Sequence, residues 1–240
     1  MVNEPTANLL ETDCFESRMT RSTPFAYSCS ACSRCCQHYL IRVNPFETLM
    51  LARHLSMTTT EFIGRYVDPG PSLKHRQSGF CMFLGEQGCT VHAARPLACR
   101  LYPLGRHVSG QGEEHFFRMK PHPETEGRYS DTGTVEDYLK AQGALAFIDA
   151  TDRYLVLFHR LYQALAQTQP GRIEEETSQD MQADSGEGRT VPDLLDLEQG
   201  IAMMFAGRSV ASLDPVEAMS VHIQALEAWL FQTHQESLDE

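Results

Sequence analysis

Cys29-Ser-Ala-Cys32-Ser-Arg-Cys35-Cys36 is the stretch of sequence that decides how this chain folds. Its C-x2-C-x2-C spacing brings three thiols close together on a tight loop, an arrangement that soft metals and iron–sulfur clusters require. A second group follows further along the chain and consists of Cys81, Cys89 and Cys99. The sequence therefore predicts a fold that is organised around a bound metal.

Disulfide bonds are the alternative use of so many cysteines, and they belong to small domains in oxidising compartments. The first twenty residues hold three glutamates and one aspartate and lack an apolar core, so we expect no secretory signal there. In a reducing cytoplasm, clustered thiols serve as ligands or redox groups. We therefore expect a cytoplasmic protein whose cysteines bind metal, with a disulfide framework as the minor alternative.

The composition limits the classes of partner. The chain has 240 residues, of which 42% are hydrophobic, enough to bury a core of ordinary size without cross-links. Its 20 Lys and Arg against 32 Asp and Glu give a net charge of -12, which repels nucleic-acid phosphates and anionic lipid. No apolar stretch approaches the roughly eighteen residues of a membrane span. We expect no nucleic-acid partner and no membrane insertion, and the oligomeric state stays open.

Short structural elements surround the cysteines. Turn residues between apolar runs predict hairpins over 80–92 and 106–118. Capping residues predict helices over 45–55 and from Thr59 or Thr60 to residue 66, and β-branched residues predict a strand over 38–43. The fold class is α+β, with a small irregular cysteine-rich metal core with short hairpins, covered by helices, plus C-terminal helices.

The chain divides into five segments by composition. From Thr134, apolar residues recur with a helical period, which predicts one long helix or two helices broken near Gly143 or Thr151. The C-terminal helices are amphipathic, so they need either the core or a protein partner to pack on. Acidic residues with few large apolar neighbours predict disorder before them. In order, the segments are an N-terminal extension 1–27, a cysteine-cluster metal-binding domain 28–130, a helical extension packing on it 131–165, a disordered acidic linker 166–192 and a C-terminal helical pair 193–240.

The adjacent cysteines Cys35 and Cys36 constrain the site. On an extended backbone, neighbouring side chains point to opposite faces, so we expect one of the two at a given metal. The other then faces a second metal or supports the first ligand as a nearby thiol. A zinc site and a four-iron cluster each take four ligands, so seven thiolates suffice for one full site and a three-cysteine site.

Other side chains near the cysteines give weaker evidence of a role in the metal site. Arg95 and Arg100 flank Cys99 and either donate hydrogen bonds to metal-bound sulfur or lie on the surface. The histidines lack ligand spacing of their own. Cys14 lies outside both groups, and we leave it out of the site.

Four motifs occur in a fixed order between Ser28 and Pro103. They are Cys29-x2-Cys32-x2-Cys35-Cys36, Phe80-Cys81-Met82-Phe83-Leu84, Gly88-Cys89-Thr90-Val91-His92 and Arg95-Pro96-Leu97-Ala98-Cys99-Arg100-Leu101-Tyr102-Pro103. Together they resemble the YkgJ-type cysteine-cluster family, which is described as a zinc- or iron-chelating domain. That family is similar in its cysteine motifs to FliB, the flagellin lysine N-methylase. Longer members carry a further Cys-Pro where this sequence has His122-Pro123, so the resemblance implies an eighth ligand there.

The sequence leaves three functions open. The first is a metal-binding cysteine-cluster protein with an iron–sulfur cluster of the 4Fe-4S type, or Zn²⁺. The alternatives are a protein lysine N-methyltransferase of the FliB type, which the resemblance implies, and a structural zinc module that binds a partner. A strand, glycine-rich turn and helix of the nucleotide-binding kind is missing from the sequence, so whether the protein is an enzyme stays open. The predicted metal ligands are Cys29, Cys32, Cys35, Cys36, Cys81, Cys89, Cys99 and His122.

Overall fold

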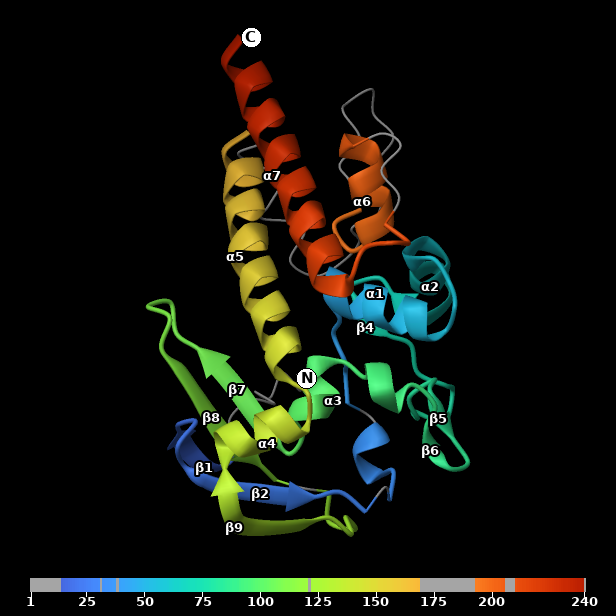
Figure 1. Cartoon of the computed structure of the whole chain (residues 1–240), viewed down its shortest axis with the longest axis vertical. Helices are drawn as coiled ribbons and strands as arrows, with labels where there is room; N and C mark the ends of the chain where they lie inside the picture. Colours follow the sequence, from blue (N-terminus) through green and yellow to red (C-terminus); the bar gives the residue numbers. More distant parts are fainter. Residues whose placement is uncertain are drawn as a thin grey trace, which may run out of the picture.

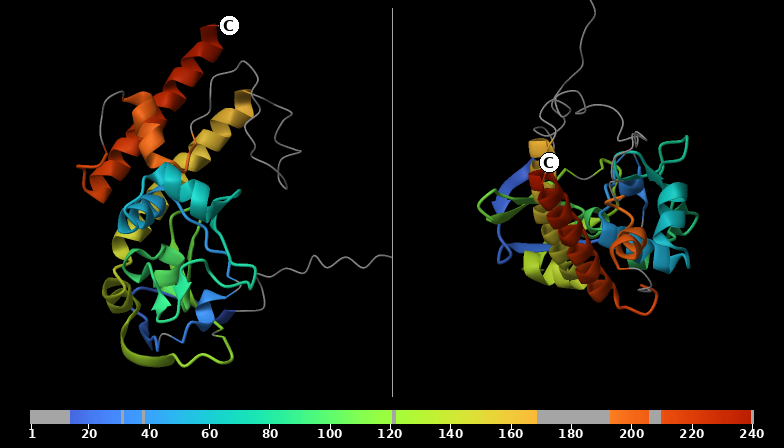
Figure 2. Two further views of the ribbon diagram at one scale, coloured as in Figure 1. Left: turned by 90° about the vertical axis from the view of Figure 1, so that its right-hand side faces the viewer. Right: turned by 90° about the horizontal axis from the view of Figure 1, so that it is seen from above.

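A computed structural model of the chain describes residues 14–30, 32–37, 39–120, 122–168, 193–205 and 210–239, without the side chains of 14–17, 165–168 and 233–239. Small antiparallel sheets form one end of the molecule and helices form the other (Figures 1 and 2). The α+β prediction is confirmed. The helices are α1 (Pro45–His54), α2 (Thr59–Tyr66), α3 (Leu97–Leu101), α4 (Val135–Ala141), α5 (Leu145–Thr168), α6 (Leu197–Met204) and α7 (Pro215–Asp239), with 3-10 turns at Arg34–Cys36 and His92–Ala94.

Every sheet is antiparallel and short. The strands are β1 (Cys14–Met19), β2 (Pro24–Ser28), β3 (Val67–Asp68), β4 (Ser72–Leu73), β5 (Leu84–Gly85), β6 (Gly88–Cys89), β7 (Leu104–Val108), β8 (Glu114–Met119) and β9 (Arg128–Thr134). They pair in the orders β1-β8-β7, β2-β9, β3-β4 and β5-β6. Both predicted hairpins are confirmed, as β5–β6 and β7–β8.

The N-terminal segment takes part in these sheets. β1 pairs with β8, and β2 pairs with β9 through Tyr27↔Tyr129 and Ser28↔Arg128. Phe25 is fully buried in the main hydrophobic cluster. Residues 14–27, which we placed in an extension, therefore hold the cysteine loop at the end of a paired strand.

The predicted strand over 38–43 is wrong. Residue 38 lies outside the described residues, and 39–43 make one isolated bridge, Arg42↔Ser72, and no ladder. Val43 N–H donates to Pro71 O at 2.9 Å, and Leu73 N–H donates to the carbonyl of Ile41 at 2.9 Å. A strand needs a longer partner, and Pro71 has no N–H to extend the pairing.

The helix starts follow from local capping. Asn44 accepts from Glu47 N–H and Glu47 accepts from Asn44 N–H, which forms a capping box at the start of α1. Thr58 rather than Thr59 or Thr60 caps α2. The helical stretch after Thr134 breaks at Gly143, whose φ of 61° lies in the left-handed region that glycine tolerates.

The C-terminal helices pack on the rest of the chain. Leu197 and Ile201 of α6 are fully buried in a cluster with Leu49 of α1. Trp229 of α7 packs in the main cluster, and α7 runs beside α5 in the same direction (Figure 1). Their apolar faces are thus largely used within the chain, and a protein partner on their outer faces stays a prediction.

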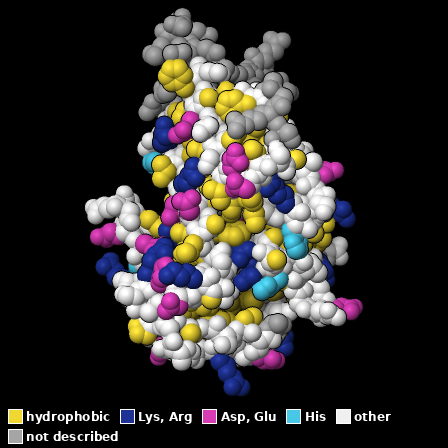
Figure 3. All heavy atoms as spheres, viewed as in Figure 1, with side chains coloured by type: hydrophobic (Ala, Val, Ile, Leu, Met, Phe, Trp, Pro, Cys, Tyr) yellow, Lys and Arg dark blue, Asp and Glu magenta, His cyan; other side chains and the backbone are white. Residues whose placement is uncertain are grey.

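The predictions of a disordered acidic linker and of no membrane insertion can be compared with the described helices. Helix α5 extends to Thr168, and the remainder of the linker prediction, 169–192, lies outside the described residues. Among the helices that the structure describes, none is long and apolar enough to cross a bilayer. Acidic and basic side chains are interspersed over the face seen in Figure 3.

Candidate metal centre

The two cysteine groups meet through the backbone. Cys81 N–H donates to the carbonyl of Cys36 at 3.0 Å, and Gln37 forms an isolated bridge with Phe80. The end of the first group is therefore hydrogen-bonded directly to the beginning of the second. This junction brings together residues that lie far apart in the sequence.

The β5–β6 hairpin places the next cysteine. Leu84 pairs with Cys89 in the hairpin register, and Leu84 N–H donates to the carbonyl of Cys81 at 3.1 Å. Cys81 and Cys89 thus lie at its two arms, as predicted, although Cys81 precedes the paired residues. The turn between them closes at Gly88, which has a φ of 103° that favours glycine.

A buried carboxylate holds the helix that carries Cys99. Pro96 occupies the N-cap position of α3 and offers no side-chain hydrogen bond. Leu97 N–H instead donates to Glu47 Oε1 at 2.6 Å. The other oxygen of Glu47 accepts from Asn44 N–H at 2.9 Å. Burial raises the pKa of Glu47 to about 7, and these two N–H groups oppose that rise. The sequence indicated only the capping of α1, because the contact with α3 depends on tertiary structure.

Replacing Glu47 with alanine should destabilise the protein by about 2 kcal/mol, because two buried N–H groups lose their acceptor. The matched control is Glu61→Ala, since Glu61 closes the same kind of capping box on α2 but is exposed. Its loss should cost clearly less, because water replaces the exposed carboxylate as acceptor. Chemical denaturation of both variants measures the difference. Equal losses would show that Glu47 acts only as a cap of α1.

Electrostatic interactions with Cys89 and Cys99 link five thiols, which are Cys35, Cys36, Cys81, Cys89 and Cys99. Burial raises the pKa of Cys99, and the thiols of Cys81, Cys89 and Cys35 raise it further. The Cys99 side chain is nevertheless exposed to solvent.

Backbone N–H groups point at several of the sulfurs. Cys32, Cys81 and Cys89 each accept a hydrogen bond from the N–H two residues later, which belongs to Arg34, Phe83 and Val91 respectively. Such donors stabilise the thiolate form that binds metal. For Cys81 and Cys89, burial outweighs this effect and raises the pKa.

The backbone at the adjacent cysteines differs from the extended one that we assumed. Cys35 and Cys36 lie in the 3-10 turn rather than on an extended backbone, and their thiols hydrogen-bond each other. Neighbouring side chains of a 3-10 turn are about 120° apart around its axis, whereas those of an extended strand point to opposite faces. The contact lowers the pKa of Cys35 and raises that of Cys36. Cys36 therefore supports Cys35 as a thiol donor.

The first two cysteines lie on another side of the loop. The Sγ atom of Cys32 is 3.9 Å from Thr125 Oγ1, and the N–H of Glu126 lowers the pKa of Cys32. Burial raises the pKa of Tyr27, and the thiols of Cys29, Cys35 and Cys32 add to that rise. Tyr27 thus borders the whole C-x2-C-x2-C run. The sequence did not single it out, because an isolated tyrosine carries no motif.

His122 lies on this same side. Its Nδ1 atom accepts from Glu124 N–H at 3.1 Å, so Nε2 carries the ring proton in this conformation. A metal-bound histidine instead donates its second N–H to an acceptor. Metal binding through Nε2 would require the ring to give up this contact, and His122 stays a predicted ligand.

Arg95 and Arg100 do not donate to sulfur. Arg100 is buried and donates to the carbonyls of Ala93, Arg95 and Gln142. Arg95 donates to the carbonyl of His92 and to the Gln142 side chain. Both guanidinium groups act on the thiols electrostatically. Arg95 lowers the pKa of Cys89, although burial has the larger, opposite effect.

The donor types suit a thiophilic metal, but their spacing in this structure does not form a closed site. Within the described part of the chain, no three His, Cys, Asp or Glu side chains are close enough around one point to hold a metal ion. The thiols of Cys32, Cys35, Cys36, Cys81, Cys89 and Cys99 are all outside disulfide bonds. Clustered thiolates repel each other without a cation, and a divalent ion or cluster reverses that penalty. Cys14, in β1, pairs with Met119 of β8, and the side chain of Cys14 lies outside the described residues.

Residues 28–122 match the family model CxxCxxCC, which is described as a "Putative zinc- or iron-chelating domain". The match begins at Ser28 and ends at His122, so it contains both cysteine groups. It confirms the resemblance that the four cysteine motifs indicate. The comparisons with curated proteins and with solved structures give no match.

Proposed function

From the match of residues 28–122 to a zinc- or iron-chelating domain, we propose that this protein holds an iron–sulfur cluster of the 4Fe-4S type through thiolates. The observation that supports the proposal is that Cys35, Cys81 and Cys89 all act on the pKa of Cys99. These thiols must move closer to share one cluster, since no three donors among the described residues surround one point in this conformation. Four thiolates are the number that one such cluster takes. A zinc ion is the alternative, because it takes the same four.

The surrounding groups have separate roles in this proposal. Cys36 donates its S–H to Cys35, and the N–H groups of Phe83 and Val91 donate to Cys81 and Cys89. Such donors tune the charge on metal-bound sulfur. Cys29 and Cys32 complete the ligand run on the Tyr27 side of the loop and are candidates for a second centre.

The setting that we propose is the reducing cytoplasm, where thiols remain available as ligands. The favoured role is metal binding or cluster carriage without catalysis. No contact among the described residues favours the lysine methyltransferase over this role. A structural zinc module is also less favoured, because the C-terminal helices that would hold its partner pack on the chain itself.

Purification without oxygen tests the proposal. We expect brown protein with about four iron atoms and about four acid-labile sulfides per chain. Absorption spectroscopy and metal analysis by mass spectrometry give the result. A colourless protein with stoichiometric zinc would replace the cluster by zinc and retain the thiolate site. Protein that retains neither iron nor zinc would overturn metal binding.

A further inference from the structure

The β7–β8 hairpin carries a histidine pair that the cysteine centre does not use. His107 and His115 lie directly opposite each other in the register of the two strands. Their ring centroids are 4.8 Å apart, and the ring planes are inclined by 46°. Two imidazoles are therefore in contact at one point of the sheet.

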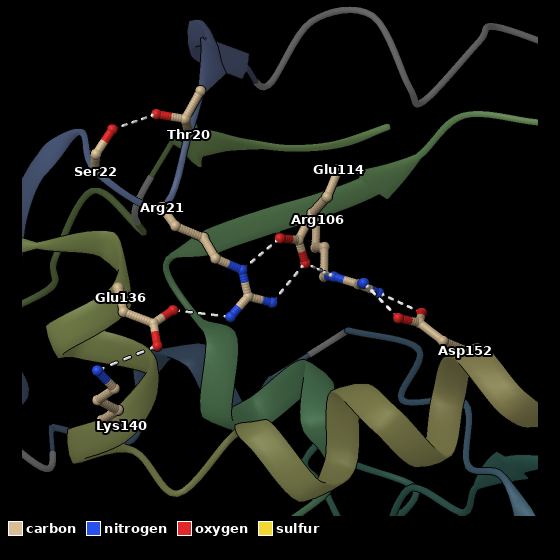
Figure 4. A network of polar contacts seen from close by, with 8 residues as sticks. All are labelled: Thr20, Arg21, Ser22, Arg106, Glu114, Glu136, Lys140 and Asp152. Atoms are coloured by element: carbon tan, nitrogen blue, oxygen red, sulfur yellow. Dashed lines mark hydrogen bonds and ion pairs between the residues drawn. The ribbon is translucent and has the colours of Figure 1, made fainter. Parts of the chain in front are cut away.

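The fold fixes the direction in which this pair points. The preceding residues, Arg106 and Glu114, form an ion pair at 2.6 Å on the opposite face of the hairpin (Figure 4). Successive side chains of a strand alternate between the two faces. His107 and His115 consequently share the outer face.

A wider ion network holds that inner face in place. Arg106 donates two hydrogen bonds of 2.7 Å to Asp152 of α5, and Glu114 also accepts from Arg21 (Figure 4). Bidentate pairs of this kind fix geometry as well as charge. The network joins the two strands to each other and to a long helix, so the spacing of the histidines is set before any ligand binds.

Both imidazoles are accessible for coordination. His107 is exposed and His115 is half-buried. Neither ring takes part in a hydrogen bond with the residues that the structure describes, which leaves the ring nitrogens available. Imidazole nitrogen suits Cu²⁺, Ni²⁺ and Zn²⁺, and among these Cu²⁺ binds most tightly to a given site.

We propose that His107 and His115 form a second, open metal site that binds a divalent first-row transition cation through one nitrogen from each ring. No third protein ligand joins them among the described side chains, so water or an external ligand fills the other positions. The site is separate from the cysteines and does not depend on the metal that they hold. It gives the protein a solvent-accessible metal site with imidazole ligands in addition to the site with thiolate ligands.

Copper(II) nitrilotriacetate is a suitable probe. The chelator leaves two adjacent copper positions free for a pair of imidazoles, and it competes for copper with protein sites that supply more ligands. We expect the full-length protein, with its own metal in place, to bind one equivalent. Electron paramagnetic resonance should show nitrogen coupling from the imidazoles. His107→Gln and His115→Gln should each weaken binding by about a hundredfold, because the second donor no longer acts at high effective concentration.

His159→Gln is the matched control, since His159 is an exposed histidine on α5, and it should bind like the wild type. The metal content of the cysteine centre and the melting temperature are measured on the same samples. A loss of copper binding without a change in either value supports the proposal. Absence of binding by the wild type, a sulfur-type spectrum, or unchanged affinity in His107→Gln would overturn it, whatever the cysteines hold.

Discussion

Replacing Cys99 with serine is expected to remove most of the bound metal and to lower the melting temperature by about 20–40 °C. Metal ligation in structural sites contributes on the order of ten kcal/mol to folding. For a chain of this size, each kcal/mol shifts the melting temperature by about 2–4 °C. Cys99 is linked to both cysteine groups, since Cys81, Cys89 and Cys35 all affect its pKa.

Cys81→Ser should produce a loss of the same size, because Cys81 stands where the two groups join through the hydrogen bond to Cys36. Cys14→Ser is the matched control, as Cys14 lies outside the site, and it should keep both metal and stability. Metal analysis and calorimetry of the anaerobically purified variants measure the effect. Wild-type metal content in both Cys81→Ser and Cys99→Ser would reduce the site to the N-terminal loop.

Acid is expected to destabilise the helical end of the molecule through His222. This side chain is fully buried in α7, and its Nδ1 atom lies 2.9 Å from the Tyr154 hydroxyl of α5. Burial lowers the pKa of His222 to about 4, although Asp196 opposes the shift. The Nε2 atom has no hydrogen-bond partner in the described part of the chain, so a second proton would be buried without an acceptor.

The sign of the effect follows from proton binding. An unfolded histidine protonates near pH 6.5 and the folded one near pH 4, so the unfolded state binds more protons in this window. The stability from the neutral ring is complete above pH 6.5 and falls by about 3 kcal/mol as the pH drops to 4.

His222→Leu isolates this effect from metal release, which acid also promotes. The variant cannot protonate at this position, so its stability relative to the wild type should rise by about 3 kcal/mol between pH 7 and pH 4. His159→Leu, at an exposed position on α5, should keep the wild-type trend. Denaturant unfolding at both pH values measures the difference. Parallel curves for His222→Leu and the wild type would contradict a buried neutral histidine.

Much of the fold could be predicted from sequence patterns only a few residues long. The capping box at Asn44, the cap at Thr134 and the turns of the two hairpins lie within a few residues of the structures that they specify. Such signals need no information about distant contacts. The break at Gly143 was one of two options, and its positive φ explains why the chain ends a helix there.

The missed features depend on contacts between distant segments. The pairing of β1 with β8 and β2 with β9 has no sequence pattern of its own. The second hydrogen bond of Glu47 joins two helices that begin about fifty residues apart, and an isolated capping box cannot indicate it. The geometry at Cys35 and Cys36 required the local backbone conformation, which spacing alone does not determine.

The position of β2 affects the order in which the newly made chain matures. β2 ends at Ser28, directly before the first cysteine, and its hydrogen-bonding partner β9 ends at Thr134. A ribosome that adds about 5–20 residues per second needs several seconds to make the intervening chain. Throughout that delay the cysteine loop lacks the support of the β2–β9 pair, although all seven cysteines of the predicted site are translated before β9. Metal that binds before β9 is made therefore meets a loop whose leading strand is still unpaired.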